Sequence, residues 1–98
     1  MKFSDKVYDV TKKIPKGYVS TYGEIARALG CKAYRAVGNA LKNNPYAPIV
    51  PCHRVISSDG SLGGFASGPK KKIKLLEKEG IEIKDNKLDL KKYFFRLS

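Results

Sequence analysis

One short segment, VPCHRV at residues 50–55, places a thiol next to the single histidine of the chain. A cysteine in this setting can be a buried structural residue, half of a disulfide, a metal ligand or a nucleophile. A nucleophile must react as the thiolate, which nearby positive charge or a hydrogen-bonded relay favours. His53 and Arg54 follow Cys52 directly, but consecutive side chains of a regular strand point to opposite faces. Cys52 and His53 can therefore cooperate only in an irregular turn, and Pro51 favours one.

Two of the other interpretations of Cys52 have less support. The chain has one further cysteine, Cys31, and we expect no export signal, so a disulfide would need an oxidising compartment that the sequence does not indicate. A structural zinc site needs about four ligands, and two cysteines with one histidine lack the usual paired spacing. An inert buried cysteine stays open, since cysteine is among the most buried residue types. We expect no metal, no cofactor and a cytoplasmic location.

The elements that position this segment follow from the spacing of apolar residues. A first helix is predicted to begin near Ser4 and to end at Pro15 and Gly17. A short extended piece, YVST, leads into TYGE, a capping box in which Thr21 caps a second helix and Glu24 bonds back to the cap. The residues expected to face inward from these two helices are Phe3, Val7, Val10, Ile14, Ile25, Ala28 and Leu29.

The segment AYRAVGNALKNNP predicts a third helix with two different faces. Arg35, Asn39 and Lys42 lie at i, i+4 and i+7, so they share an outward face. Gly38 lies beside them and leaves room for a ligand or backbone to approach. The apolar face consists of Ala36, Val37, Ala40 and Leu41. Two short helices joined by a tight turn, the second with a basic outward stripe, predict a helix-turn-helix.

The rest of the chain mixes strand and helix patterns. Apolar residues on both sides of Asp59-Gly60 indicate a small hairpin or wing formed by Val55, Ile56 and Leu62. A further helix is predicted between Pro69 and Gly80, packing through Ile73, Leu75 and Leu76. IEIKDNKLDL then predicts a short strand or hairpin. The expected fold class is mainly α with short β-strands, a winged-helix-like helix-turn-helix domain over residues 1–98.

Charge indicates the class of partner. Lys and Arg number 20 against 9 Asp and Glu, a net charge of +11. No acid lies between Glu24 and Asp59, and the next one is Glu77. This basic middle region predicts binding to nucleic acid. The lysines at 70–72 oppose the dipole of their helix, so they are either solvated or near a phosphate. No apolar run approaches the roughly 20 residues that span a bilayer, and we expect no membrane association.

Four motifs in order, YRAVGNALKNNP, PCHRV, GGFASG and LLEKEG, closely resemble those of the O6-alkylguanine-DNA alkyltransferases. The resemblance runs from about Tyr18 to Gly80, and PCHRV is highly specific to that family. It implies a catalytic C-terminal-type domain without the N-terminal domain that many members carry, acting as a monomer. The partner would be double-stranded DNA containing O6-alkylguanine, entered from the minor groove. The damaged base would be flipped out, and its alkyl group would move to Cys52 in a single turnover.

The resemblance also implies roles for individual residues. Cys52 would accept the alkyl group, and His53, through a water and Glu79, would generate the thiolate. Tyr22 would donate a proton or hydrogen bond to guanine N3. Arg35 would fill the space that the flipped base leaves. Asn44 would tie the helix-turn-helix to the active-site turn.

Further contacts would complete the pocket and the DNA interface. The main-chain carbonyls of Cys52 and Val55 would read the guanine amine, and the backbone at Ala66 would address O6. Phe65-Ala66 stands where the family commonly has Tyr-Ser, so two hydroxyls are lost. The DNA contacts expected besides Arg35 come from Lys32, Gly38, Asn39, Lys42 and the lysines at 70–72.

Three functions fit these observations. The first is single-turnover alkyl transfer from DNA. The second is that of an alkyltransferase-like protein, which binds alkylated guanine and flags it for other repair without transfer. That group places another residue, often tryptophan, where Cys52 stands, so the thiol favours transfer. The third is a winged-helix transcription factor, which would need neither PCHRV nor Glu79.

Overall fold

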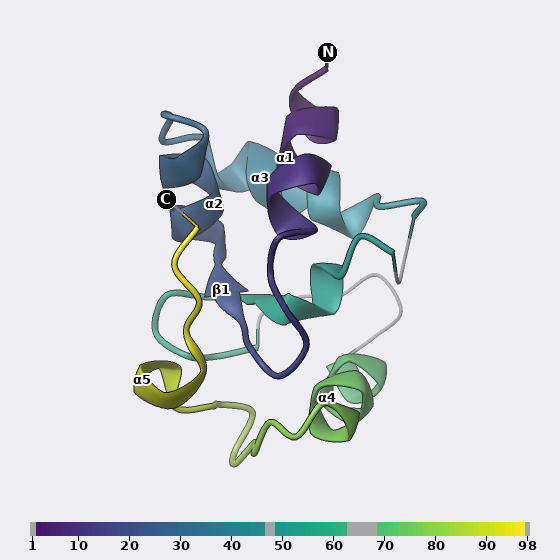
Figure 1. Ribbon diagram of the computed structural model, residues 1–98, viewed down its shortest axis with the longest axis vertical. Helices are drawn as coiled ribbons and strands as arrows, with labels where there is room; N and C mark the ends of the chain where they lie inside the picture. The colour runs from purple at the N-terminus through teal and green to yellow at the C-terminus, as the bar shows by residue number, and fades with distance from the viewer. Residues whose placement is uncertain (1, 47–48, 63–68, 98) are drawn as a thin grey trace.

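Residues 2–46, 49–62 and 69–97 are described by a computed structural model of the chain (Figure 1). In these ranges the fold is mainly helical with two short strands, as expected. Figure 1 shows α1, α2 and α3 together at one end, with α4 and α5 at the other. The elements are α1 Phe3–Thr11, β1 Ser20–Thr21, α2 Tyr22–Ala28, α3 Tyr34–Lys42, the 3-10 turn η1 Cys52–Arg54, β2 Val55–Ile56, α4 Pro69–Lys78 and α5 Leu90–Tyr93.

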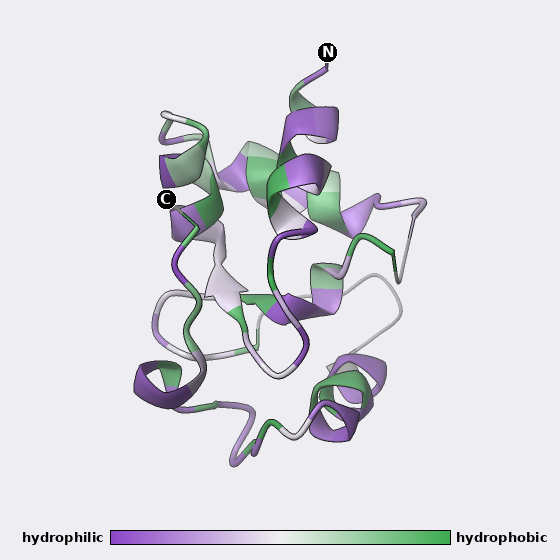
Figure 2. Cartoon of the chain, in the orientation of Figure 1, coloured by the Kyte–Doolittle hydropathy of each residue, from purple (hydrophilic) through white to green (hydrophobic). Residues whose placement is uncertain are grey.

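The first three helices pack around one apolar cluster. Val7 of α1, Ile25 of α2 and Val37 of α3 are fully buried in it. The hydroxyl of Tyr8 donates to the Ala40 carbonyl at 2.8 Å and so joins α1 to α3. In Figure 2 hydrophobic and hydrophilic residues alternate along these helices, as amphipathic elements require. The helix-turn-helix pair, α2 and α3, is therefore held against α1 by side chains from all three elements.

α1 differs from its predicted extent. It ends at Thr11, whose hydroxyl donates to the Val7 carbonyl at 2.7 Å. Two tight turns follow, and they carry Ile14 into the core although it lies outside the helix. The residue before a proline is disfavoured in helical geometry, so the chain turns before Pro15 is reached. Phe3, predicted to be buried, is 37% exposed.

Over the ranges that the structure describes, only one of the two hydrogen bonds of the predicted capping box is present at the start of α2. The Thr21 hydroxyl accepts the backbone N–H of Glu24 at 3.0 Å. The Glu24 carboxylate accepts from Arg27 Nε at 3.0 Å and from the Leu97 N–H at 2.6 Å. No bond from this carboxylate to the Thr21 backbone is found among the described residues. Glu24 therefore fastens the end of the chain to α2 rather than closing the cap.

The two strands pair in parallel with each other, a pairing that the sequence patterns did not predict. Ser20 is opposite Val55 and Thr21 is opposite Ile56. Val55 belongs to the first apolar cluster and Ile56 to a second one. A strand buried on both faces is typical of parallel pairing. The predicted hairpin forms in a minimal version: the turn at Gly60 has φ of 90°, and the Ser57 N–H donates to the Ser61 carbonyl at 3.0 Å.

The second apolar cluster holds the C-terminal part against β1 and β2. Leu76 of α4, Ile81 and Tyr93 of α5 pack there with Val19 and Ile56. The Val19 N–H donates to the Tyr93 carbonyl at 2.8 Å, and its carbonyl accepts from Phe95.

The predicted hairpin in IEIKDNKLDL is a minimal one. Lys84 and Lys87 bond to each other in both directions, at 2.9 and 3.0 Å. Asp85 and Asn86 between them have φ of 53° and 61°, as a tight two-residue hairpin turn requires. Within the described part of the chain, no helix is long and apolar enough to cross a membrane.

Candidate active site

Cys52 begins the 3-10 turn η1 and belongs to the first apolar cluster. Its backbone N–H donates to the Val50 carbonyl at 2.8 Å, and the Arg54 N–H closes the turn on the Pro51 carbonyl at 2.9 Å. Both Cys52 and His53 are buried, so the irregular turn places the two neighbours inside the fold together. Cys31 and Cys52 are both free thiols. The disulfide interpretation is therefore wrong.

Glu79, at the end of α4, lies against the turn and joins two of its side chains. His53 Nε2 is 3.0 Å from Glu79 Oε2. Arg54 donates to the same carboxylate twice, from Nε to Oε1 at 2.9 Å and from Nη2 to Oε2 at 2.6 Å. The side chains of His53 and Glu79 are only 4% and 11% exposed. A glutamate that is 26 positions away in the chain thus faces the histidine beside the thiol.

The protonation states of this group follow from its surroundings. Burial lowers the pKa of His53 below its ordinary value, and the charges of Arg54 and Lys72 act in the same direction against Glu79. Burial would raise the pKa of Glu79, but the hydrogen bonds from Arg54 and His53 outweigh it, and this pKa is lowered. An ionised carboxylate only accepts hydrogen bonds, so a neutral His53 must carry its proton on Nε2. Nδ1 is then the acceptor.

Tyr22, the first residue of α2, lies close enough to Cys52 to interact with it electrostatically. Burial raises the pKa of Tyr22, and the negative charge of an ionised Cys52 raises it further. Tyr22 therefore keeps its proton at neutral pH and can donate it. It lines a cavity of about 480 Å³ with Gly23, Tyr34 and two serines, Ser57 and Ser58. Tyr34, next to Arg35, was not among the predicted site residues, and its only signal in the sequence is that position.

Asn44 connects the end of α3 to the chain before the turn. Its side-chain Nδ2 donates to the Val50 carbonyl at 2.9 Å, and its Oδ1 accepts the Tyr46 N–H at 2.9 Å. Val50 is the residue whose carbonyl also accepts the Cys52 N–H. A single carbonyl therefore links Asn44 to the backbone of Cys52.

Lys72 corrects an expectation for the lysines at 70–72. It is 0% exposed, and its Nζ donates to the Val55 carbonyl at 2.7 Å and to the Leu62 carbonyl. Burial lowers its pKa to about 8. Lys72 is thus neither solvated nor available to a phosphate, while Lys70 and Lys71 are exposed. The Val55 carbonyl, expected to read guanine, already holds this ammonium group with one of its two lone pairs.

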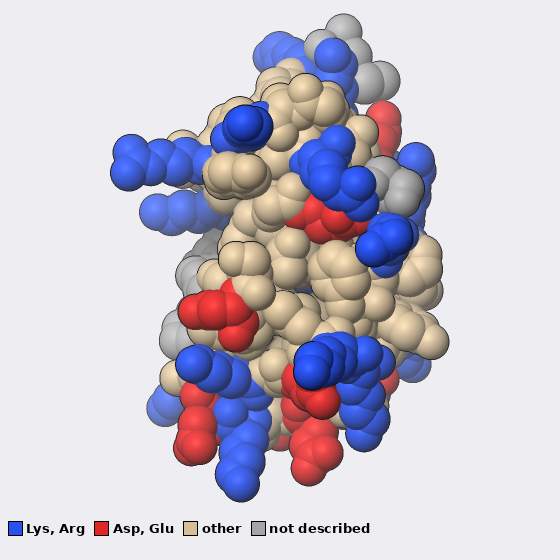
Figure 3. Space-filling model, turned by 90° about the vertical axis from the view of Figure 1, so that its left-hand side faces the viewer, with Lys and Arg blue, Asp and Glu red and all other residues tan. Residues whose placement is uncertain are grey.

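The residues expected to contact DNA lie at the surface. Arg35, Asn39 and Lys42 are exposed on α3, as is Lys32 before it. A Cβ added to Gly38 would meet open space, so the surface there is unobstructed. Figure 3 shows one face of the molecule with Lys and Arg side chains spread across it and most acidic groups toward its lower end. Phe65 and Ala66 lie outside the described residues.

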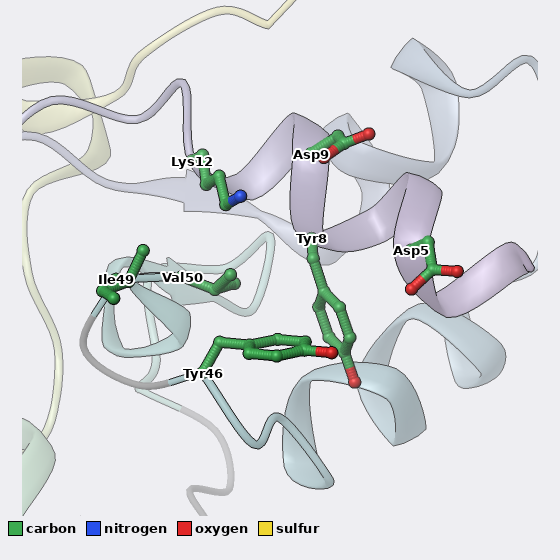
Figure 4. A pocket seen from close by; sticks show the side chains of 7 residues that line it. All are labelled: Asp5, Tyr8, Asp9, Lys12, Tyr46, Ile49 and Val50. Atoms are coloured by element: carbon green, nitrogen blue, oxygen red, sulfur yellow. The ribbon is translucent and has the colours of Figure 1, made fainter. Parts of the chain in front are cut away.

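A second cavity, of about 330 Å³, opens between α1 and the chain near Tyr46 (Figure 4). The Tyr46 ring meets the Tyr8 ring edge-on, with centroids 5.7 Å apart. Asp5 and Asp9 line this cavity, so its carboxylates repel a phosphate backbone. The cavity near Tyr22 is therefore the better candidate for the side that faces DNA.

Comparison with known proteins identifies relatives over most of the chain. The model of the family described as 6-O-methylguanine DNA methyltransferase, DNA binding domain, matches residues 2–81. The bifunctional methyltransferase/endonuclease of Picrophilus torridus is 48% identical over 90 residues, which are 91% of this chain and 30% of that protein. The methylated-DNA–protein-cysteine methyltransferase of Thermococcus kodakarensis is 49% identical over 81 residues, 82% of this chain and 45% of that protein. The chain thus spans less than half the length of either relative.

A solved structure matches the chain over nearly its whole length. S. pombe Atl1, crystallised in complex with damaged DNA containing O6-carboxymethylguanine, gives a TM-score of 0.87 at 40% identity. The match covers 98% of this chain and 99% of that one. The family description names DNA binding and not catalysis, so the expected catalytic C-terminal-type domain gives way to the broader statement. The chain belongs to the family of the DNA-binding domain of 6-O-methylguanine DNA methyltransferases.

Proposed function

We propose that this chain repairs double-stranded DNA by moving an alkyl group from O6 of guanine to Cys52, once per molecule. The observation that carries the proposal is the buried turn in which the free Cys52 thiol adjoins His53, itself 3.0 Å from Glu79. A thiol beside a base that a third group orients is the arrangement of an activated nucleophile. Two relatives of the family are named for methyl transfer.

In the proposed transfer, Cys52, His53, Glu79 and Tyr22 each have one role. The thiol proton passes, through a water, to Nδ1 of His53, the nitrogen that Glu79 leaves free. The sulfur attacks the alkyl carbon, and the S–C bond forms as the C–O6 bond breaks. The electron pair of the broken bond stays on guanine, whose N3 takes a proton or hydrogen bond from Tyr22. The product thioether is stable, so a protein molecule acts once.

Damage rather than sequence would govern binding. The flipped guanine would enter beside Cys52 from the minor groove, and Arg35 would occupy the vacated space in the stack. Unstacking a base costs a few kcal/mol, so a side chain that fills the gap recovers part of that cost. Lys32 and Lys42 would contact phosphates, which positions the duplex without reading bases.

A second function has a specific observation in its favour. The chain matches Atl1 over 99% of that chain's length, but only 30% and 45% of the two relatives named for methyl transfer. An alkyltransferase-like protein binds the lesion and leaves it unchanged. Cys52 is the feature that argues against this alternative, because lesion binding alone does not need a thiol in that turn.

Intact-mass analysis after incubation with a duplex containing one O6-methylguanine tests the proposal. We expect a gain of one methyl group, located by peptide mapping on Cys52. Cys52→Ala should gain nothing, and Cys31→Ala, which removes the other free thiol, should gain the methyl group as the unaltered protein does. An unchanged mass together with preferential binding of the damaged duplex would reject transfer in favour of lesion flagging.

A further inference from the structure

Arg54 makes three hydrogen bonds that the transfer chemistry described above does not use. Two go to the Glu79 carboxylate, and the third runs from Nη1 to the Ile14 carbonyl at 2.9 Å. The Arg54 side chain is 17% exposed. We propose that Arg54 is a positioning residue that fixes the Glu79 carboxylate and thereby keeps His53 neutral with Nδ1 as its acceptor. The inference rests on the proposed function, because it names what prepares His53 for that chemistry.

The geometry of the pair determines how the carboxylate can be used. Arg54 occupies both oxygens of Glu79 in a forked arrangement, and His53 shares Oε2 with Nη2. Forked arginine–carboxylate pairs restrict the orientation of both planes. Because Nη2 of Arg54 already donates to Oε2, His53 can approach this oxygen only along its remaining lone-pair direction. The imidazole is therefore held by a carboxylate that cannot rotate freely.

The third hydrogen bond holds the guanidinium from the opposite side. The Ile14 carbonyl lies in the chain between α1 and β1, and Ile14 itself is 1% exposed. Arg54 is thus anchored to a part of the core that belongs neither to the turn nor to α4. Its position does not depend on Glu79 alone, so Arg54 can hold the Glu79 carboxylate in a fixed orientation.

Charge supports the same role. The charged groups that face His53 are Glu79 at the end of α4, Arg54 in the turn and Lys72 within α4. A His53–Glu79 pair without Arg54 would favour the imidazolium, since an isolated carboxylate stabilises a neighbouring positive charge. Arg54 neutralises that carboxylate and repels a proton on His53. A protonated His53 has no acceptor nitrogen and could not take the thiol proton.

The single histidine makes the test direct. His53 is titrated by NMR in the unaltered protein, in Arg54→Gln and in Arg27→Gln. Arg27 is the matched control because it also donates twice to one carboxylate, that of Glu24, at 3.0 and 3.3 Å. In Arg54→Gln we expect the midpoint to rise by about one pH unit, and in Arg27→Gln we expect no change. In Arg54→Gln the acid limb of the rate–pH profile for alkyl transfer should shift to higher pH together with the His53 midpoint.

A merely structural arginine would give a different result. An unchanged His53 midpoint in Arg54→Gln, with only a lower melting temperature, would overturn the proposal. If that variant does not fold, Arg54→Lys decides: it keeps the charge but lacks the fork, and we expect transfer about fivefold slower than in Arg27→Lys. Equal rates in those two lysine variants would also overturn it. If the unaltered protein transfers no alkyl group, the proposed function fails, while the His53 titration still tests Arg54.

Discussion

At the scale of single residues, Tyr22 has the property that a proton donor needs. Its pKa is raised by burial and by the charge of an ionised Cys52, so it stays protonated when the thiol has lost its proton. Tyr22 therefore still holds a proton that it can donate while the sulfur of Cys52 would attack. A side chain that keeps its proton at neutral pH is what the proton-donating step of the proposed transfer requires.

We expect Tyr22→Phe to slow alkyl transfer by about 100-fold, the lower end of the range for general acid–base groups. The ring that lines the cavity is retained, so binding of the damaged duplex should change little. Single-turnover transfer rates and lesion binding are measured side by side. Tyr18→Phe is the control, because Tyr18 is 45% exposed and its ring contacts Phe95. Equal losses of binding and rate in Tyr22→Phe would show that the hydroxyl serves binding instead.

The separation of the site residues along the chain explains which of them could be predicted from the sequence and which could not. Cys52, His53 and the irregular turn are adjacent in the chain, so local chemistry predicts them. Glu79 entered only through the resemblance to a family, because 26 positions separate it from His53. The contact of Arg54 with the Ile14 carbonyl spans 40 positions, and no local pattern encodes it. Contacts of this kind depend on the packing of whole elements.

At the scale of elements, α4 is fixed to β2 by a lysine. Periodicity predicted α4 correctly, because its apolar residues and its bounding proline and glycine are local signals. The burial of Lys72 has no such signal, since its partners are the backbone carbonyls of Val55 and Leu62. The same reason explains why the pairing of β2 was not predicted: Val55 and Ile56 pair with a strand that lies more than 30 positions earlier.

Lys72 should make stability depend on pH in the alkaline range. Its pKa falls from 10.5 to about 8 on folding, so between these values the unfolded chain binds more protons than the folded one. Stability therefore rises with pH across this window and gains nothing further above it. We expect the free energy of unfolding of the unaltered protein to increase relative to Lys72→Met from pH 8 to pH 10.

Urea unfolding at several pH values measures this difference. Lys74→Met, which removes an exposed lysine from the same helix, is the control and should run parallel to the unaltered protein. Because each variant is compared at the same pH, the titration of tyrosines cancels. A constant difference between the unaltered protein and Lys72→Met across the window would contradict the lowered pKa.

At the scale of the whole molecule, the net charge of +11 acts on any DNA partner before specific contacts form. The charge is not uniform along the chain, because residues 25–58 contain no acid. That stretch includes α3 and the turn with Cys52. α3 and Cys52 therefore lie in the same basic segment, so attraction of this segment to phosphate would also bring the thiol toward DNA.

The salt dependence of DNA binding distinguishes direct contacts with phosphates from general electrostatic attraction. The logarithm of the DNA-binding constant falls linearly with the logarithm of the salt concentration, and each phosphate that the protein neutralises makes this slope more negative by about 0.9. We expect Lys32→Gln with Lys42→Gln to reduce the magnitude of that slope by about two. The control pair, Lys84→Gln with Lys91→Gln, removes the same charge from exposed positions in the C-terminal part. If general attraction alone binds DNA, both pairs change the slope equally. If α3 contacts the phosphates, only the first pair does so, and it does so on damaged and undamaged duplexes alike, because phosphate contacts carry no information about the base.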